Sequence, residues 1–461
     1  MTNHHDPLEA WLSQDVELLP PREGTFHRVR RRARRRKAVQ AMSVAAAAAV
    51  VVAAAASLPQ LAGNLLSRPS TGPDRVGTGK ASPTSHATKP SATASAHPSA
   101  GVSSPTGVPL AAAGSGPRPA ANFQPTSVTF VGRHFGAVLG QGGKACAKGL
   151  CTAIAGTADY GLRWTAMAAP PTEAPEGSSG VSQIRFLNLR DGWAYGPALY
   201  VTHDGGERWS QSRALRGRII DLAAMNGRVF AVASRCSGQG RAWASGCTSF
   251  ALYSANAGSH RWRAVPGASG TGSVAPGAIQ LSGSSGYLLA GHRIYAGPLT
   301  PGSWHVVTVG LGASPPCLRT ASQNLALIAP NGTDLYLACA ASPSAIAAAG
   351  GTGSATLYLS ADGGRSWQRR GTVKTHGVAT SLAVSPAGVL VLGTMTGIWW
   401  SPDAIAWHRA SLGGRAPRDG FTFVGMTIAG KGVAVPTDWA LHSVFITRDG
   451  GRNWTRSPIT R

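Results

Sequence analysis

The chain has 461 residues, 59 of them glycine, and a formal net charge of +24. So much glycine with few stretches of helical periodicity excludes a mainly helical protein and favours an all-β fold. The charge alone would suit nucleic acid, but the N-terminal sequence predicts export, where nucleic acid is seldom met, so no nucleic-acid partner is expected.

Residues 1–37 form a polar tail that ends in a cluster of arginines and Lys37. No charge follows from Ala38 to Ser67, and Ala41–Leu58 is apolar apart from two serines. Such a run is close to the minimum for a membrane-spanning helix, and cations on one flank predict a cytoplasmic N-terminus. We therefore predict a cytoplasmic basic tail at 1–37 and a transmembrane helix at 38–60, in a single-pass protein of the cell membrane whose remaining chain is extracellular. A cleaved signal peptide, which would give a secreted protein, is the alternative, although 37 residues are long for a charged leader.

Residues 61–121 are rich in Ser, Thr, Pro, Ala and Gly and poor in large apolar residues. Because such a segment cannot bury enough surface to fold, we predict a disordered linker. It would separate the membrane from a globular domain at 122–461.

One eight-residue pattern, Ser/Thr-x-Asp-x-Gly-x-x-Trp, occurs intact four times in residues 122–461, and we call it the box. The Asp can accept hydrogen bonds from amides of its own turn, the Gly can adopt a positive φ, and the Trp can fill the space between two sheets. A structural role accounts for every specified position, so no box residue is expected to be catalytic. The four copies are Thr157, Asp159, Gly161, Trp164; Thr202, Asp204, Gly206, Trp209; Ser360, Asp362, Gly364, Trp367; and Thr447, Asp449, Gly451, Trp454.

Three decayed boxes lie between the intact ones. Together the boxes supply seven tryptophans that recur roughly every 40–60 residues, which is the period of propeller blades. We therefore predict an all-β, seven-bladed β-propeller. The decayed copies are Ser254-x-Asn256-x-Gly258, which reaches Trp262 one residue late; Ser401-x-Asp403, which reaches Trp407 one residue early; and a lone Trp304.

The second repeat shows how four strands fit one period. Strands are expected at Ser182–Leu189, Trp193–Gly196, Leu199–Val201 and Trp209–Arg213, and the box lies between the third and the fourth. Glycine-containing turns, such as the one at Asp191, supply the positive φ of tight hairpins.

The box resembles the Asp-box, or bacterial neuraminidase repeat, of sialidases and many non-enzymatic propellers. The stretch from Phe186 through Gly192 and Trp193 to the box at 202–209 is most similar to repeats of photosystem II assembly factors. The resemblance covers residues 122–461 and implies the propeller fold, but one propeller hosts many unrelated activities.

All six cysteines lie in the predicted propeller and form local pairs in the sequence. An even number in an exported domain predicts disulfides, although six cysteines allow 15 pairings. Neighbouring strands favour three of these pairings, and no spacing typical of metal ligands is present, so no metal and no cofactor are expected. The predicted disulfides are Cys146–Cys151, Cys236–Cys247 and Cys317–Cys339.

A sialidase would need a tyrosine nucleophile paired with a glutamate, and an acid/base aspartate. Tyr200, Tyr253 and Tyr358 each precede a box, which indicates packing and not a unique nucleophile. No facing carboxylate pair, which glycoside hydrolysis requires, can be assembled from the acids outside boxes and hairpin turns. We therefore predict no catalytic residue and a non-catalytic binding module; a divergent sialidase-like glycoside hydrolase is the alternative. The remaining acids are Asp221, Asp419, Asp438, Glu173 and Glu176.

An up-and-down blade of four strands places its box turn and its first hairpin turn on one face of the propeller, which we call the box face. The connections between strands two and three, and those between blades, lie on the other face, which we call the insertion face because the long insertions fall there. Cations and two tryptophans outside the boxes are expected on the insertion face, which suits an unknown protein partner or an anionic envelope glycan. This candidate ligand face comprises Arg213, Arg216, Arg218, Arg235, Arg241, Trp243, Arg369, Arg370, Lys374 and Trp439.

Overall fold

The computed structural model describes residues 109–460 apart from 147–148, 174–177, 239–243, 273, 275–276, 310–313, 320–323 and 428–429. The predicted cytoplasmic tail, the transmembrane helix and most of the linker therefore lie outside the described residues. Within the part of the chain that is described, no helix is long and apolar enough to cross a membrane.

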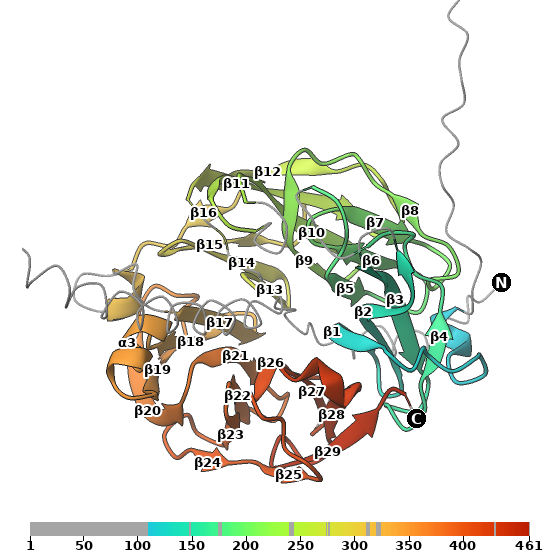
Figure 1. The fold of residues 1–461 in the computed structure, drawn as a ribbon. Helices are drawn as coiled ribbons and strands as arrows, with labels where there is room; N and C mark the ends of the chain where they lie inside the picture. The colour runs from blue at the N-terminus through green and yellow to red at the C-terminus, as the bar shows by residue number, and fades with distance from the viewer. Residues whose placement is uncertain are drawn as a thin grey trace, which may run out of the picture. The chain divides into compact units, whose positions relative to one another are not determined.

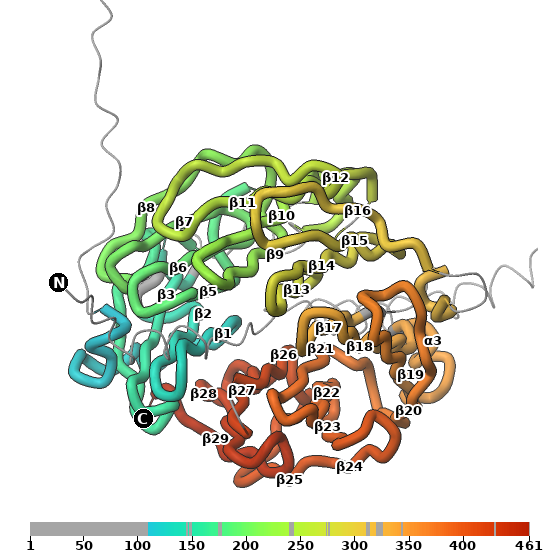
Figure 2. Tube along the Cα trace, turned by 180° about the vertical axis from the view of Figure 1, so that it is seen from behind, coloured from blue at the N-terminus to red at the C-terminus, as the bar shows by residue number. Residues whose placement is uncertain are grey.

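Seven sheets follow one another along the described chain and form a seven-bladed β-propeller, which confirms the predicted architecture. Figure 1 shows the sheets arranged in a ring, with the first strand of each sheet nearest the centre, and Figure 2 shows the same ring from behind. We number the blades 1 to 7 in chain order.

Blades 1 to 4 each contain four antiparallel strands in sequential order. Their bounds are β1 Gln124–Val131, β2 Phe135–Cys146, β3 Gly149–Thr157 and β4 Thr165–Met167; β5 Gln183–Phe186, β6 Gly192–Tyr195, β7 Leu199–Thr202 and β8 Ser210–Gln211; β9 Arg218–Met225, β10 Arg228–Cys236, β11 Cys247–Asn256 and β12 Arg263–Thr271; β13 Ile279–Ser282, β14 Ser285–Ala290, β15 Arg293–Pro298 and β16 His305–Val306.

Blades 5 to 7 repeat this plan, and β25 adds a fifth, parallel strand to the outer edge of blade 7. Short helical turns are η1 Leu110–Ala112, η3 Pro316–Leu318, α3 Pro343–Ala348 and η4 Trp439–Leu441. The strands are β17 Asn324–Asn331, β18 Asp334–Ala340, β19 Thr352–Ser360 and β20 Gln368–His376; β21 Ala379–Val384, β22 Leu390–Thr394, β23 Gly397–Ser401 and β24 His408–Arg409; β25 Ser411–Gly413, β26 Phe421–Met426, β27 Gly432–Pro436, β28 Ser443–Thr447 and β29 Asn453–Pro458.

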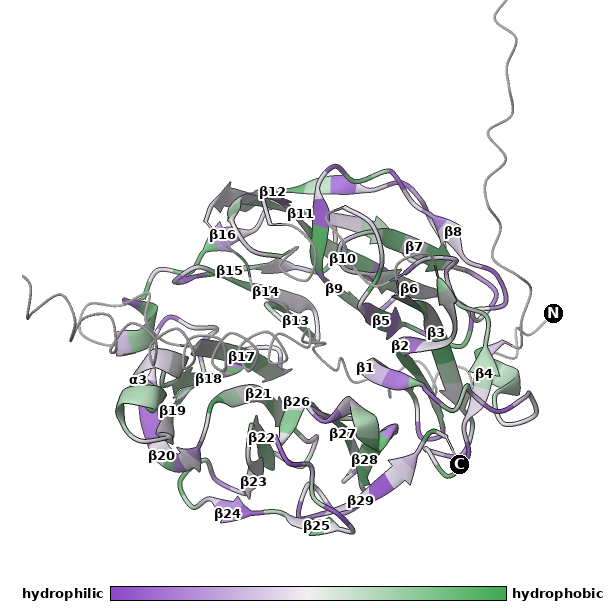
Figure 3. Cartoon of the chain, viewed as in Figure 1, coloured by the Kyte–Doolittle hydropathy of each residue, from purple (hydrophilic) through white to green (hydrophobic). Residues whose placement is uncertain are grey.

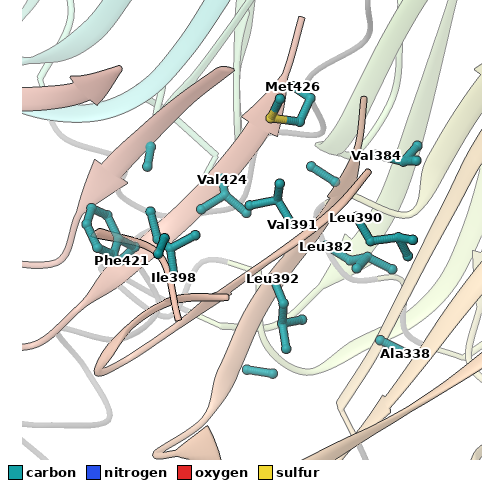
Figure 4. Close-up of a cluster of buried hydrophobic side chains, with 14 of the residues drawn as sticks. Ala338, Leu382, Val384, Leu390, Val391, Leu392, Ile398, Phe421, Val424 and Met426 are labelled. Atoms are coloured by element: carbon teal, nitrogen blue, oxygen red, sulfur yellow. The ribbon is translucent and has the colours of Figure 1, made fainter. Parts of the chain in front are cut away.

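Apolar side chains fill the space between neighbouring blades. Every residue of the inner strands β21 and β26 is buried, because both faces of each blade pack against a neighbour. Figure 4 shows one such cluster, in which Leu382 and Val391 of blade 6 lie with Val424 and Met426 of blade 7. The outer strand β24 of blade 6 is hydrophilic (Figure 3) and exposed, in contrast to the buried inner strands.

Side-chain oxygens link the inner strands of neighbouring blades. The innermost strand of each sheet has an edge without a strand partner, and buried backbone amides need acceptors. Ser127 Oγ accepts from the amide of Ile184 at 3.2 Å, and Ser381 Oγ accepts from the amide of Val424 at 2.8 Å. These hydrogen bonds fasten blade 1 to blade 2 and blade 6 to blade 7.

Asp221 makes the same type of link between blades 3 and 4. Its Oδ2 accepts from the amide of Ile279 at 2.8 Å, and the side chain is almost fully buried. Burial raises the pKa of Asp221 to about 6, although the amides of Ile279 and Leu222 and the charge of Arg185 act to lower it. Burial also lowers the pKa of Arg185 on β5, whose Nε and Nη1 have no hydrogen-bond partner. Asp221 is thus an inaccessible structural acceptor.

The three predicted disulfides are confirmed. Cys236 and Cys247 join the ends of the neighbouring strands β10 and β11, as expected. Cys317 differs from the expectation of adjacent strands, because it lies in η3 and fastens the connection between blades 4 and 5 to Cys339 on β18.

The ring closes between blades 7 and 1 through side chains, because no strand of the described chain is shared between two blades. Tyr160, inside the first box, is buried and has a φ of 55°. Its hydroxyl donates to the carbonyl of Gly432 at 3.0 Å, and Lys431 Nζ lies 4.5 Å from the centre of its ring. Trp164 Nε1 donates to Ser457 Oγ at 2.9 Å in the same interface.

We predict that Tyr160 stabilises the interface between blades 7 and 1. Tyr160→Phe removes the hydrogen bond to Gly432 and should lower the free energy of unfolding by about 1 kcal/mol. Tyr160→Ala also empties a packed site and should cost about 3–5 kcal/mol. Equilibrium urea unfolding measures both, with the partly buried Tyr253→Phe as the matched control. Equal effects of Tyr160→Phe and Tyr253→Phe would contradict the assignment.

Candidate functional site

The intact boxes are turns held by a repeated set of hydrogen bonds. In blade 1, Thr157 Oγ1 donates to Asp159 Oδ1 at 2.9 Å and accepts from the amide of Gly161 at 2.9 Å. Asp159 Oδ1 also accepts from the amide of Arg163 at 2.9 Å. The box oxygens therefore serve the turn itself. The same bonds join Thr202, Asp204 and Gly206; Ser360, Asp362 and Gly364; and Thr447, Asp449 and Gly451.

Hydrogen bonding lowers the pKa of two box carboxylates, those of Asp362 and Asp449. At Asp362, partial desolvation acts to raise the pKa, but hydrogen bonds from Ser366 and Ser360 outweigh it and lower the pKa to about 2. The pKa of Asp449 is lowered in the same way, by Asn453 and Thr447 against partial desolvation.

We predict that acid weakens the box turns in a defined window. A depressed carboxylate stabilises the fold above its unfolded pKa of about 3.9 and loses this contribution as pH falls through the folded value. The urea concentration at the unfolding midpoint should therefore decrease as the pH is lowered from 4 to 2. This decrease should be smaller in Asp362→Asn than in Glu207→Gln. Asp221 acts in the opposite sense. Its pKa in the folded protein is raised to about 6, so its contribution to stability is lost as the pH rises through that value. That pH range lies outside the window of the box carboxylates. An unchanged slope in Asp362→Asn would contradict the prediction.

The tryptophans of the four intact boxes are at most 7 % exposed, whereas the tryptophans of two decayed boxes, Trp262 and Trp407, are only partly buried. The third decayed copy, Trp304, is buried, but no box turn precedes it. Its indole Nε1 donates to the carbonyl of Pro298, and its amide donates to the carbonyl of Pro266 in blade 3. Packing of blade 4 on blade 3 is thus retained without a box turn.

A cleft of about 1400 Å³ opens where the boxes have decayed. It is lined by the hairpin and box turns of blades 3, 4 and 5, including Asn226, Ser254, Ser284 and Thr333. These turns all belong to the box face. The short connection Leu299–Ser303 replaces the box of blade 4 and forms part of the wall.

The cleft is rich in arginine. Arg228, Arg261, Arg263 and Arg365 line it, and Asp362 is its one carboxylate among the described residues. Three of these arginines are exposed, while Arg228 is partly buried and donates from Nη2 to Ser254 Oγ at 3.0 Å. Both oxygens of Asp362 are engaged by Ser366 and the box turn. The cleft therefore has an excess of positive charge.

The aromatic residues of the cleft are buried: Phe230, Tyr287 and Trp304 are at most 3 % exposed. Tyr287 donates its hydroxyl to the carbonyl of Gly332 at 2.6 Å. These rings form the packed wall of the cleft, and the side chains that remain available to a ligand include the exposed arginines, His305 and Val306.

Part of the candidate ligand face lies around blades 2 and 3. Arg213 and Arg216 are exposed between β8 and β9, and Arg235 is exposed near the end of β10. Arg218 starts β9, where its Nη1 donates to the carbonyl of Gly238 at 2.6 Å. A hollow of about 150 Å³, partly lined by Arg213, lies there on the insertion face.

The other described members of the candidate ligand face lie in blades 5 and 7, and of these Trp439 lies in the connection between β27 and β28, on the insertion face. Arg369, Arg370 and Lys374 lie within β20, the outer strand of blade 5, and not in a connection between blades, because β20 continues to His376. In the strand register Arg369 lies opposite Tyr358 of β19, beside the box turn. Trp439 is 43 % exposed in η4 of blade 7. Arg241 and Trp243 lie outside the described residues.

Four of the five propeller acids that lie outside boxes and hairpin turns are described, and none of these four lines the cleft. Asp438 Oδ1 accepts from the amide of Ala440, and Glu173 forms a β-bridge with Cys151. Asp419 lies between β25 and β26, Asp221 is buried, and Glu176 lies outside the described residues.

Sequence reasoning missed the cleft arginines because it assigned the box face to structure alone. A signal was available: two successive repeats, those of Trp262 and Trp304, lack an intact box. A box that decays in neighbouring blades marks the place where the box face can open.

No family model matches the sequence, and no curated protein matches it. Among solved structures, the chain is similar to YCF48 bound to a D1 peptide, with 15 % identity, a TM-score of 0.45, and coverage of 72 % of this chain and 95 % of that one. It is also similar to a GH74 xyloglucanase from Xanthomonas campestris, with 13 % identity, a TM-score of 0.22, and 70 % of each chain covered. The computationally designed Ika8 protein gives 11 % identity and a TM-score of 0.42, over 72 % of this chain and 85 % of that one. These similarities are consistent with a β-propeller and say nothing further about function.

Proposed function

We propose that this chain is a non-catalytic binding module that holds an anionic ligand, either a protein partner or an envelope glycan, in the box-face cleft. The observation that carries the proposal is the set of four arginines in one cleft of about 1400 Å³. Arginine presents a planar fork of donors that pairs bidentately with carboxylates and phosphates.

The acids support binding and not hydrolysis. Two carboxylates on opposite sides of a bond are required by most glycoside hydrolases. Asp362, the acid that lines the cleft in the described structure, is already bound by Ser360 and Ser366. Turnover of a fluorogenic glycoside panel by the full-length protein, abolished by one carboxyl substitution, would instead favour the sialidase-like hydrolase.

We also propose that the propeller is extracellular and tethered to the cell membrane by the segment at 38–60. Three disulfides that use all six cysteines support an oxidising compartment. The arginine cluster before the apolar run supports a cytoplasmic N-terminus.

We predict that anion binding depends on the cleft. Replacing Arg261, Arg263 and Arg365 by Ser should weaken the binding of poly-L-glutamate and polygalacturonate to the full-length protein by at least about tenfold, since each charge-assisted hydrogen bond is worth about 1.5–3 kcal/mol. Fluorescence anisotropy with labelled polymers measures the change.

The matched control replaces Arg213, Arg216 and Arg218 by Ser, which removes the same charge from the candidate ligand face. Equal losses in both triple variants would show unspecific attraction by net charge and contradict the proposal. A loss in the control variant alone would place the site on the insertion face.

A further inference from the structure

Two histidines and an aspartate meet on the box face between blades 2 and 3. His203 occupies an unspecified position of the second box, and Asp191 lies in the first hairpin turn of the same blade. His203 Nδ1 lies 2.8 Å from Asp191 Oδ1. The ring of His260, from blade 3, lies with its centre 5.2 Å from that of His203, and the two planes are 75° apart.

The decay of the third box brings His260 to this place. Its turn has three residues between Gly258 and Trp262, where an intact box has two. Gly258 has a φ of 72°, and a Cβ at this position would lie 3.8 Å from Asp191 Oδ1. The longer turn of blade 3 therefore packs against the hairpin turn of blade 2 and carries His260 towards His203.

Asp191 determines which nitrogen of His203 carries the proton. A carboxylate accepts hydrogen bonds, so Nδ1 donates, and in the neutral imidazole Nε2 then carries the free lone pair. Asp191 is itself fixed, because its Oδ2 accepts from Asn188 Nδ2 at 2.9 Å. Nε2 of His203 is buried and has no hydrogen-bond partner, which is costly for a polar atom unless something binds it.

We propose that His203 and His260 bind a divalent transition-metal ion, with Asp191 as the positioning residue. A histidine that ligates a metal through one nitrogen commonly gives its other N–H to a carboxylate, which orients the ring and raises its basicity. The contact between His203 and Asp191 has this form.

The spacing of the rings agrees with two ligands on one ion. With metal–nitrogen distances of about 2.0–2.1 Å and tetrahedral geometry, two imidazole centres lie about 5 Å apart, and here they are 5.2 Å apart. Imidazole ligands suit Zn²⁺, Cu²⁺ or Ni²⁺, and not Mg²⁺ or Ca²⁺.

The site reaches solvent through His260, whose side chain is exposed, whereas Nε2 of His203 is buried. Among the described residues, no group of three or more His, Cys, Asp or Glu side chains could hold a metal ion, so two histidines leave further coordination positions for water or an anion. Ser259 and Arg261, on either side of His260, line the cleft. The metal site does not depend on the proposed function, because its ligands lie outside the lining of the cleft.

Cu²⁺ titration of the full-length protein tests the proposal, with electron paramagnetic resonance as the readout. All variants carry His4→Ala and His5→Ala, because these neighbouring histidines near the N-terminus would add a second site. One Cu²⁺ per chain with two imidazole nitrogens is expected. Either His203→Ala or His260→Ala should remove it, and Asp191→Asn should weaken affinity about 10–100-fold.

His305→Ala, an exposed histidine in blade 4, is the matched control and should change neither stoichiometry nor spectrum. Circular dichroism melting shows whether each variant is folded, and the exposed His260 can be replaced without disturbing the core. One nitrogen donor in the spectrum, or unchanged binding in His260→Ala, would overturn the proposal.

Discussion

The hydrogen bonds of the first box residue are the constraint on which the turn and the tryptophan of each intact repeat depend. In each intact copy a serine or threonine hydroxyl donates to the box aspartate and accepts from the box glycine amide, so that three residues close one turn. That turn directs the tryptophan into the gap between two blades, where it excludes water. The sheets are short, and they are stable only because each face is covered by its neighbour.

The loss of intact boxes also explains where charged and polar side chains gather on the box face. Blades 3 and 4 keep their tryptophans but lose the intact turn, and the box face opens between blades 3 and 5. One residue added to the turn of blade 3 brings His260 beside His203. Both features arise from departures from the repeat, since an intact box uses its polar atoms internally.

The fold could be predicted from the sequence because the box is a local pattern that repeats with a blade-like period. In blade 2 the expected strands agree with β5 to β8 to within a few residues, and the disulfide between Cys236 and Cys247 follows from neighbouring strands. The cleft could not be predicted, because its arginines come from blades 3 and 5, which are not consecutive, and share no spacing. Arg369 and Arg370 were expected between blades because nothing in the sequence shows that β20 continues to His376. Histidines 203 and 260 are far apart in sequence, and only the contact between two turns brings them together.

The interface between blades 7 and 1, which we call the seam, has a consequence for how such a protein can evolve. Within the described residues every blade is a continuous stretch of chain, and the seam is held by side chains such as Tyr160 and Trp164. A whole repeat can therefore be duplicated or deleted without breaking a ladder of backbone hydrogen bonds in any other blade. Because no strand is shared between two described blades, the number of blades can evolve in steps of one repeat.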